Sequence, residues 1–381
     1  MLFRNYLNRR VAARTIPVLV LTLVLFPFTT IIAAGRPEVP VAPVDERRQE
    51  TDELVIYGYD SLPGTLRRAI TEHFEEEYGV AVDLQRLGDT GAVYTQLYLE
   101  RQDPQADVVI GLDESYLPRI RRDQLLEPYE PRRINLVRDD LLVDPEFLAV
   151  PYDFGYITLN YDSDALREGP ETWRDLLDPS LENSIIMLNP GTSSPGRNFL
   201  LFTIAEFGDG TDRVPGRVHT QPGGAPADTP EDYLEFWRRL RPNVLTVTGG
   251  WSDGYGLYTQ GEAPIVVSYE TSPAFHRHFE ETDRYRAILP EGGAYMQVEI
   301  AGIVRGARNR LNAERLIDFI LSREFQELIA LSQIMYPVHP DVELPDAFLA
   351  TPGVERAVTL DNDLIAEHFS EWLEAWEDVM R

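Results

Sequence analysis

A serine between two glycines is the first residue of this sequence that could carry chemistry. The pentapeptide GWSDG, residues 250–254, matches the G-x-S-x-G nucleophile elbow, and it lies between an expected strand at 245–249 and an expected helix at 251–260. A catalytic interpretation makes Ser252 the nucleophile of an exported serine hydrolase. The alternative is a helix N-terminus whose free N–H groups and serine hydroxyl bind a polar group of a ligand.

The hydrolase interpretation needs an acid and then a histidine after the serine. Asp283 with His339 or His368 could fill these roles, but with six histidines in the chain such pairs are easily found. No HGGG-type sequence for an oxyanion hole accompanies the motif. The sequence therefore favours ligand binding at this helix N-terminus over catalysis by Ser252.

Three more polar clusters follow expected strands, at the edge where open α/β sheets bind ligands. They are Tyr57, Tyr59, Asp60 and Ser61 after the first strand, the turn NPGTSSPG (189–196), and Tyr269, Glu270, Thr271, Ser272 and Pro273 after the strand 263–269. With Trp251, Tyr255 and Asp89 they offer aromatic faces and carboxylates, which suit a flat cationic heterocycle. Each desolvated cation–π contact stabilises such a ligand by about 0.5–2 kcal/mol.

Two residue types are missing from the chain. Without lysine it can form neither a P-loop nor a Schiff base, and without cysteine it has no disulfide, thiol nucleophile or lipidated N-terminal cysteine. The net charge of −28 makes nucleic acids and anionic membrane surfaces poor partners. His276 and His278 flank an arginine and lie on different faces of an expected helix, so we expect neither a metal site nor a cofactor.

Alternating strands and helices are expected to position the polar clusters. The first unit has strands at 54–59, 81–87 and 106–112 and helices at 63–78 and 91–102; the second has strands at 184–190, 245–249 and 263–269 and helices at 195–207, 230–240 and 251–260. This alternation predicts an α/β fold with mostly parallel sheets flanked by helices. Helices are also expected at 312–322, 323–333 and 364–380, whereas 208–232 is expected to be a mobile surface loop without binding residues.

Two long extended runs are expected to connect two lobes. Residues 147–162 are too many for one ordinary strand, and Pro151 and Gly155 are expected to break the run in the middle. Residues 294–307 form the expected return crossing. We therefore expect lobe I to comprise 52–147 with about 290–335, and lobe II to comprise 148–289 with about 336–381.

The N-terminus has the features of an export signal. Arginines between Arg4 and Arg14 precede the nearly uncharged stretch 16–34, and small residues follow for cleavage. Residues 1–35 are therefore expected to be a signal peptide, or an N-terminal anchor if uncleaved, because about 20 apolar residues can span a bilayer. Residues 36–51 are proline-rich and charged, which predicts a disordered linker and a folded part in the periplasm or another extracytoplasmic space.

Motifs at these strand ends resemble, in order over roughly residues 52–350, those of the periplasmic thiamine-binding proteins of ABC importers. The motifs are YGYDS (57–61), ADVVIGLD (106–113), VPYDFGYITLNYD (150–162), PGTSSPG (190–196), TVTGGWSDGYGLY (246–258), VVSYETSPAFH (266–276), YMQVEIAG (295–302) and MYPV (335–338). The resemblance implies a type II periplasmic-binding-protein fold, in which two α/β lobes close over the ligand. It also implies hinges near Pro151–Tyr156 and Glu299–Ile303.

The resemblance further implies which residues contact the ligand. They are Tyr59, Asp89, Thr90, Ser193, Ser194, Trp251, Tyr269, Glu270, Thr271, Ser272 and Pro273, with Phe275 where the family usually has tyrosine. Asp60 and Tyr255 complete the expected site as members of the same polar clusters. Two tryptophans that are usual in the family are absent, near Leu62 and at Ile334.

The resemblance predicts a monomeric binding protein, not an enzyme, that captures thiamine and delivers it to an ABC permease. The altered aromatic set leaves thiamine phosphates and the pyrimidine fragment open as ligands. Two other functions also remain open. One is the serine hydrolase that uses Ser252, and the other is a binding protein for a different cationic solute such as a polyamine, whose cleft would contain more carboxylates than aromatic rings.

Overall fold

The first part of the chain builds a parallel sheet with helices between its strands. The computed structural model describes residues 51–220, 228–349 and 351–381. The first elements are β1 (Glu53–Gly58), α1 (Gly64–Tyr78), β2 (Ala81–Arg86), α2 (Thr90–Glu100), β3 (Val108–Asp113), α3 (Leu117–Asp123) and β4 (Leu126–Glu127). β1 pairs in parallel with both β2 and β3, as the alternating pattern predicts. α1 buries Leu66, Ile70 and Phe74 at helical spacing and ends where Gly79 adopts a left-handed conformation.

The second part of the chain repeats this design. Its elements are α4 (Trp173–Leu176), β6 (Ile185–Leu188), α5 (Ser194–Phe207), α6 (Arg217–Thr220), α7 (Tyr233–Leu240), β7 (Val244–Thr248), α8 (Trp251–Thr259), β8 (Ile265–Tyr269), α9 (Ser272–Phe279) and β9 (Tyr285–Ile288). β6 pairs in parallel with β7 and β8. The predicted strands and helices of this part are confirmed, although α7 begins later than expected, where Asp232 caps its first turn by accepting from the Glu235 N–H.

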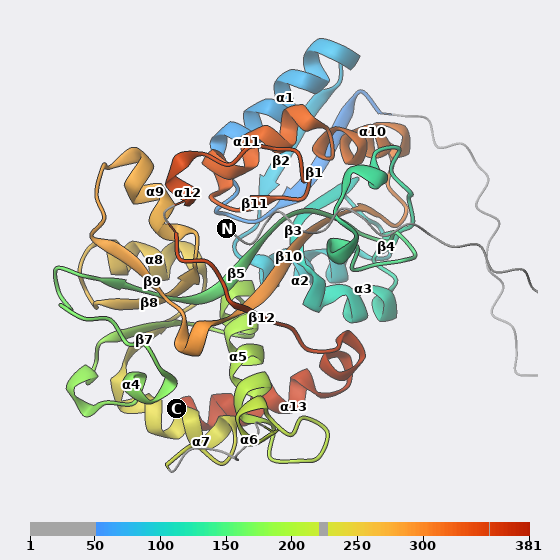
Figure 1. Cartoon of the computed structure of the whole chain (residues 1–381). Helices are drawn as coiled ribbons and strands as arrows, with labels where there is room; N and C mark the ends of the chain where they lie inside the picture. Colours follow the sequence, from blue (N-terminus) through green and yellow to red (C-terminus); the bar gives the residue numbers. More distant parts are fainter. Residues whose placement is uncertain (1–50, 221–227, 350) are drawn as a thin grey trace, which may run out of the picture. The chain divides into compact units, whose positions relative to one another are not determined.

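Two long antiparallel strands, β5 (Val150–Asp162) and β10 (Gly293–Val304), join the two parts (Figure 1). They lie at the centre of one mixed sheet with the order β2-β1-β3-β10-β5-β8-β6-β7. The expected break in the run 147–162 is wrong, because β5 is continuous. Its register against β10 shifts between Pro151 and Asp153, so Tyr152 forms a bulge that accommodates the proline.

The C-terminal segment returns across both parts. Its elements are α10 (Arg310–Ile320), α11 (Arg323–Gln333), β11 (Tyr336–Pro337), α12 (Asp346–Leu349), β12 (Arg356–Val358) and α13 (Asn362–Met380). α11 packs against α1, whereas α13 packs against α7. The predicted terminal helix is confirmed, with Ile365, Phe369, Trp372 and Trp376 buried along one face.

The buried apolar side chains form two main cores. The first includes residues between Leu54 and Phe154 and between Val298 and Val338. The second includes residues from Ile157 to Tyr295 and, on α13, from Ile365 to Trp376. Both crossing strands therefore pass from one core to the other, β5 between Phe154 and Ile157 and β10 between Tyr295 and Val298. The fold is the expected two-lobed α/β arrangement, while the finer lobe boundaries given above stay a prediction.

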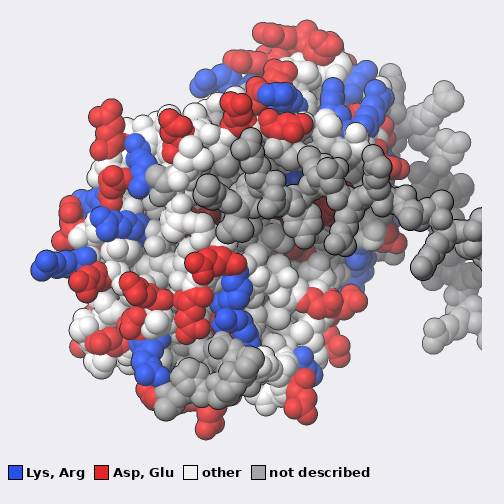
Figure 2. Space-filling view, in the orientation of Figure 1, with Lys and Arg blue, Asp and Glu red and all other residues white. Residues whose placement is uncertain are grey.

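Three sequence predictions concern the margins of this fold. The expected signal segment and all of the expected linker except its last residue lie outside the described residues. The segment 208–232 is not wholly irregular, because α6 forms within it and the Asp209 N–H donates to the Val214 carbonyl at 3.1 Å. In the described part of the chain no helix has the length and apolar character needed to cross a membrane. Acidic and basic side chains are interspersed on the face shown in Figure 2.

Candidate functional site

A cavity of about 350 Å³ is lined by residues that belong to, or pack against, both cores. This volume lies in the range of about 300–1,000 Å³ that is usual for small-molecule sites. The lining consists of the aromatic residues Tyr59, Trp251, Tyr255, Tyr269 and Phe275, the polar residues Ser61, Asp89, Thr90, Ser194, Ser272, Glu299, Ser332 and Gln333, and Pro63, Pro195, Ile334 and Met335. Its two carboxylates face the cavity together with aromatic rings, and the lining includes no arginine or histidine.

Tyr59 follows β1 directly, and its ring packs over a glycine of the neighbouring strand. Gly111 in β3 has a φ of 90°, and a Cβ atom there would lie 1.7 Å from the Tyr59 ring. Only glycine leaves room for the ring at this position. The Tyr59 hydroxyl donates to Glu299 Oε2 at 3.0 Å and accepts from the Gln333 side-chain amide of α11.

Glu299, in the middle of β10, is the most deeply buried acid of the cavity lining that lacks backbone donors. Its Oε2 accepts from the hydroxyls of Tyr59 and Tyr152, and its Oε1 lies 3.4 Å from Gln297 Nε2 and 3.5 Å from the Tyr269 hydroxyl. Burial raises the pKa of Glu299 to about 7, although the two tyrosine hydroxyls act in the opposite direction. The side chain is only 6% exposed.

Asp153 of β5 lies directly opposite Glu299 in the antiparallel register. It is fully buried, and neither of its carboxylate oxygens has a hydrogen-bond partner among the described residues. Burial first and the charge of Glu299 second raise the pKa of Asp153 well above its ordinary value. We call Asp153 and Glu299 the carboxylate pair.

Trp251 and Tyr255 form an aromatic wall on the first turns of α8. Their rings stack with centroids 4.8 Å apart and an interplanar angle of 18°. The Trp251 indole N–H donates to Ser268 Oγ at 2.9 Å, and the Tyr255 hydroxyl lies 2.9 Å from His276 Nε2. These hydrogen bonds fix the edges of both rings, so their faces are presented in a defined orientation.

Asp89 connects the aromatic wall to the opposite side of the cavity. It caps α2 by accepting from the Thr90 N–H at 2.6 Å, and its second oxygen accepts from the Trp251 N–H at 2.9 Å. A Cβ atom at Gly250 would lie 2.8 Å from that oxygen, so the glycine permits this close approach. Burial raises the pKa of Asp89, whereas the two backbone N–H groups lower it.

Further hydrogen bonds join the two sides around the cavity. Ser252 Oγ donates to Asp60 Oδ1 at 3.1 Å, and the Gly91 N–H donates to the Thr192 carbonyl at 2.9 Å. Ser194 Oγ, at the start of α5, donates to the Asp113 carboxylate at the end of β3. The arrangement is therefore that of a cleft held closed by polar contacts around an enclosed cavity.

The cavity gathers nine of the fourteen predicted site residues. They are Tyr59, Asp89, Thr90, Ser194, Trp251, Tyr255, Tyr269, Ser272 and Phe275. Asp60, Ser193, Glu270, Thr271 and Pro273 do not line it. Consecutive residues of an extended segment point to opposite sides, so where Tyr59 and Tyr269 face the cavity, Asp60 and Glu270 face away. Glu270 instead accepts from the Tyr336 hydroxyl.

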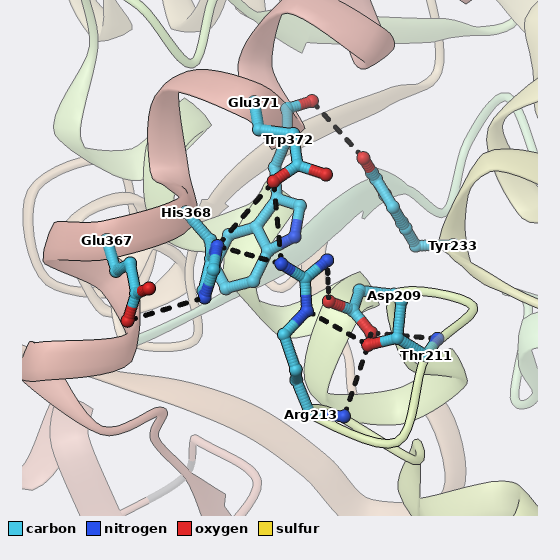
Figure 3. Close-up of polar contacts among 8 residues, drawn as sticks. All are labelled: Asp209, Thr211, Arg213, Tyr233, Glu367, His368, Glu371 and Trp372. Carbon is cyan, nitrogen blue, oxygen red and sulfur yellow. Dashed lines mark hydrogen bonds and ion pairs between the residues drawn. The ribbon is translucent and has the colours of Figure 1, made fainter.

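The groups nominated for a hydrolase are engaged elsewhere. His368 on α13 lies 2.9 Å from Arg213 Nη1, within a cluster that includes Asp209 and Glu371 (Figure 3). The Asp341 N–H donates to His339, and Asp283 accepts from Arg277 at 2.6 Å. In the described ranges Ser252 bonds to a carboxylate and not to an imidazole, and no group of three or more histidines and acids is arranged to bind a metal ion.

Sequence reasoning missed several residues of the lining, above all Glu299 and Gln333. Glu299 lies in a run that was expected to serve only as a hinge, and a charged residue in such an apolar strand was the available signal. Ile334, where the related family usually has tryptophan, also lines the cavity. Its φ of 58° is rare for a β-branched residue, and it ends α11.

Comparisons with known proteins agree with this geometry. Residues 103–364 match the family model described as bacterial extracellular solute-binding protein. The thiamine-binding periplasmic protein of Brucella abortus biovar 1 is 34% identical over 335 residues, which is 86% of this chain and 92% of the relative. The thiamine-binding periplasmic protein of Escherichia coli K12 is 29% identical over 332 residues, which is 85% of this chain and 92% of the relative.

Solved structures give the same result. A periplasmic thiamin binding protein superposes with a TM-score of 0.75 at 27% identity, covering 86% of this chain and 96% of the other. A periplasmic binding protein from Actinobacillus pleuropneumoniae with fructose-6-phosphate bound superposes with a TM-score of 0.68 at 20% identity, covering 86% and 98%. The second likeness supports the fold alone, because its identity is low.

Proposed function

This chain belongs to the bacterial extracellular solute-binding proteins, and from that membership we propose that it binds thiamine outside the cytoplasm and delivers it to the permease of an ABC importer. The observation that carries the proposal is the composition of the cavity. Aromatic faces from Tyr59, Trp251, Tyr255 and Tyr269 surround a space that also contains Glu299 and Asp89. Thiamine presents two flat rings, one of which is a permanently charged thiazolium, so each property of the ligand has a counterpart in the lining.

The cavity also favours thiamine over its phosphate esters. A phosphate would bring negative charge into a space lined by two carboxylates and without an arginine or histidine in its lining. Serine hydroxyls and helix N–H groups near Ser194 could donate to it, but they supply no net positive charge. We therefore expect the affinity to decrease from thiamine to its monophosphate.

We propose ligand contacts for the nine predicted residues that line the cavity, and for Glu299 and Gln333 in addition. The five residues that do not line it are assigned supporting roles. Asp60 belongs to the Ser252–Asp60 contact that closes the cleft. Opening would bend the crossing strands β5 and β10 where they pass between the two cores, near the hinges expected from the sequence.

Titration of the purified full-length chain with thiamine, followed by calorimetry and tryptophan fluorescence, tests the proposal. Submicromolar binding is expected, with a change in fluorescence that arises from Trp251 in the cavity. Trp251→Ala should weaken binding roughly ten- to thirtyfold, because it removes about 1–2 kcal/mol of ring stacking and cation–π contact. Trp376→Phe, in the second core, is the matched control and should change neither measurement.

Absence of thiamine binding to the wild-type protein would overturn the proposal. A hydrolase function makes a different prediction, which a fluorophosphonate probe tests directly. The proposed function requires that Ser252 stays unlabelled and that Ser252→Ala alters only the affinity, through loss of the contact with Asp60. Covalent labelling that disappears in Ser252→Ala would favour the hydrolase.

A further inference from the structure

Two buried carboxylates lie side by side below the cavity without a positive partner. Asp153 and Glu299 are directly opposite each other on β5 and β10, where the Cβ atoms of such pairs are about 4.5–5.5 Å apart. The first is fully buried, and the second is buried except where it lines the cavity. In the described part of the chain no ion pair within 4 Å includes either of them. Like charges in this position destabilise a sheet, so the pair requires an explanation.

Every group that faces Glu299 from the surrounding elements is neutral or acidic. Tyrosine hydroxyls approach it from the end of β1, from β5 and from β8, and Gln297 approaches from its own strand. The charged groups that act on it besides Asp153 are Asp113 at the end of β3 and Asp89 at the start of α2, and both are acids. The missing counter-charge is therefore not supplied by these neighbours.

A fully ionised pair in this position would be strongly disfavoured. Removing a carboxylate from water costs several kcal/mol unless a cation or several donors compensate, and two adjacent carboxylates cannot both ionise easily. The usual solution is that the two groups share one proton and titrate together. The raised pKa values of both acids agree with a shared proton in the empty protein.

We propose that Glu299 selects cationic ligands, and that the arriving cation takes the place of a proton held by the carboxylate pair. The inference rests on the proposed function for its choice of thiamine as the cation. On binding, the O–H bond of the pair breaks, the proton passes to solvent, and Glu299 becomes the counter-ion of the thiazolium while Asp153 retains its own proton. The charge within the site is thereby balanced without an arginine or a lysine.

This exchange predicts how affinity depends on pH. The thiazolium charge is permanent, so only the protein titrates. Below about pH 7 the empty pair carries the extra proton, which must leave before the cation binds, and affinity should fall by up to about tenfold for each further pH unit. Well above pH 7 the proton is already absent from the empty protein, and affinity should level off.

Calorimetry of the full chain measures the proton directly. Thiamine is titrated near pH 6 and near pH 8.5 in buffers with different ionisation enthalpies, and the dependence of the observed heat on the buffer gives the number of protons released. Release close to one proton is expected near pH 6, and release close to zero near pH 8.5. This measurement needs no variant, so it does not depend on the folding of a mutant.

A neutral ligand and two variants identify the group responsible. Deazathiamine, in which a thiophene replaces the thiazolium, should bind the wild-type protein more weakly, with no proton release. Glu299→Gln should abolish release for thiamine and lower its affinity at least tenfold near pH 8.5, while leaving deazathiamine almost unaffected. Glu114→Gln is the matched control, because Glu114 is a buried acid on the same side that does not line the cavity, and it should retain proton release.

The outcomes separate this inference from the function on which it rests. If thiamine does not bind at either pH, the proposed function and the inference both fail. If thiamine binds without releasing a proton near pH 6, and deazathiamine binds equally well, thiamine capture stands and the role of Glu299 is overturned. Loss of release in Glu114→Gln as well as in Glu299→Gln would also overturn it, because a general negative potential would then explain the effect.

Discussion

Glu206 on α5 and Glu299 on β10 are both buried acids, but their surroundings differ in one respect. Glu206 pairs with Arg356 Nη1 at 2.5 Å and with Arg217 Nη1 at 3.4 Å. Glu299 is met only by hydroxyl and amide donors. The fold therefore compensates the acid that serves its own packing and leaves uncompensated the acid that faces the cavity. An absent counter-charge marks the functional carboxylate better than burial does.

The largest expected effect in this comparison is on Glu206. Glu206→Gln removes both ion pairs and leaves the Arg356 guanidinium, whose side chain is 21% exposed, without its carboxylate. The free energy of unfolding near neutral pH should fall by about 3 kcal/mol, as is typical when one partner of a buried pair is lost. Urea denaturation measures this change. Thiamine affinity of the folded protein should be unchanged, and a stability equal to wild type would break the comparison.

The same substitution at Glu299 should have the opposite sign. The unfolded chain loses the Glu299 proton near the ordinary pKa of 4.5, whereas the folded protein keeps it to about pH 7, so wild-type stability falls as pH rises between these values. Glu299→Gln removes this loss and should raise the free energy of unfolding near pH 8 by on the order of 2–3 kcal/mol.

Near pH 4 the same variant should match wild type, because the acid is then protonated in both the folded and the unfolded state. Urea denaturation of the ligand-free protein at both pH values measures the difference. Equal destabilisation at both pH values would show that Glu299 contributes to packing in the same way as Glu206.

A smaller effect is expected from the hydroxyl groups around Glu299. Tyr152→Phe removes one donor to its carboxylate, which should raise the pKa of Glu299 further and lower stability near pH 8 by about 1 kcal/mol. Tyr258→Phe is the control, because the buried Tyr258 hydroxyl has no hydrogen-bond partner among the described residues. If both variants behave alike, the hydroxyl of Tyr152 does not stabilise the carboxylate.

Much of the fold could be predicted because the relevant signals are local. Alternating apolar periods located the strands and helices of both parts, and the strand ends at Tyr59 and Tyr269 do meet at one cavity. The continuity of β5 could not be predicted, because the bulge at Tyr152 that accommodates Pro151 depends on pairing with β10. Local sequence cannot report a partner that is more than a hundred residues distant.

The same limit applies to the site. Asp60 and Glu270 were predicted from their positions at strand ends, but which side of an extended segment faces the cavity depends on the twist and bulges of the whole sheet. Glu299 becomes a lining residue only when hydroxyls from Tyr59, Tyr152 and Tyr269 converge on it from three other strands or strand ends. Such a convergence is a property of the assembled sheet and not of any motif.

The two crossing strands also determine when the chain can fold. β5 and β10 pair over a long sequence separation, and the first core needs residues up to Val338, while the second needs α13 near the C-terminus. Neither core can be completed by the N-terminal part alone, and closing such long loops is slow. Folding is therefore expected to begin late and to proceed as one event, so a chain whose C-terminal segment is still being made or translocated remains extended enough to pass through a narrow channel.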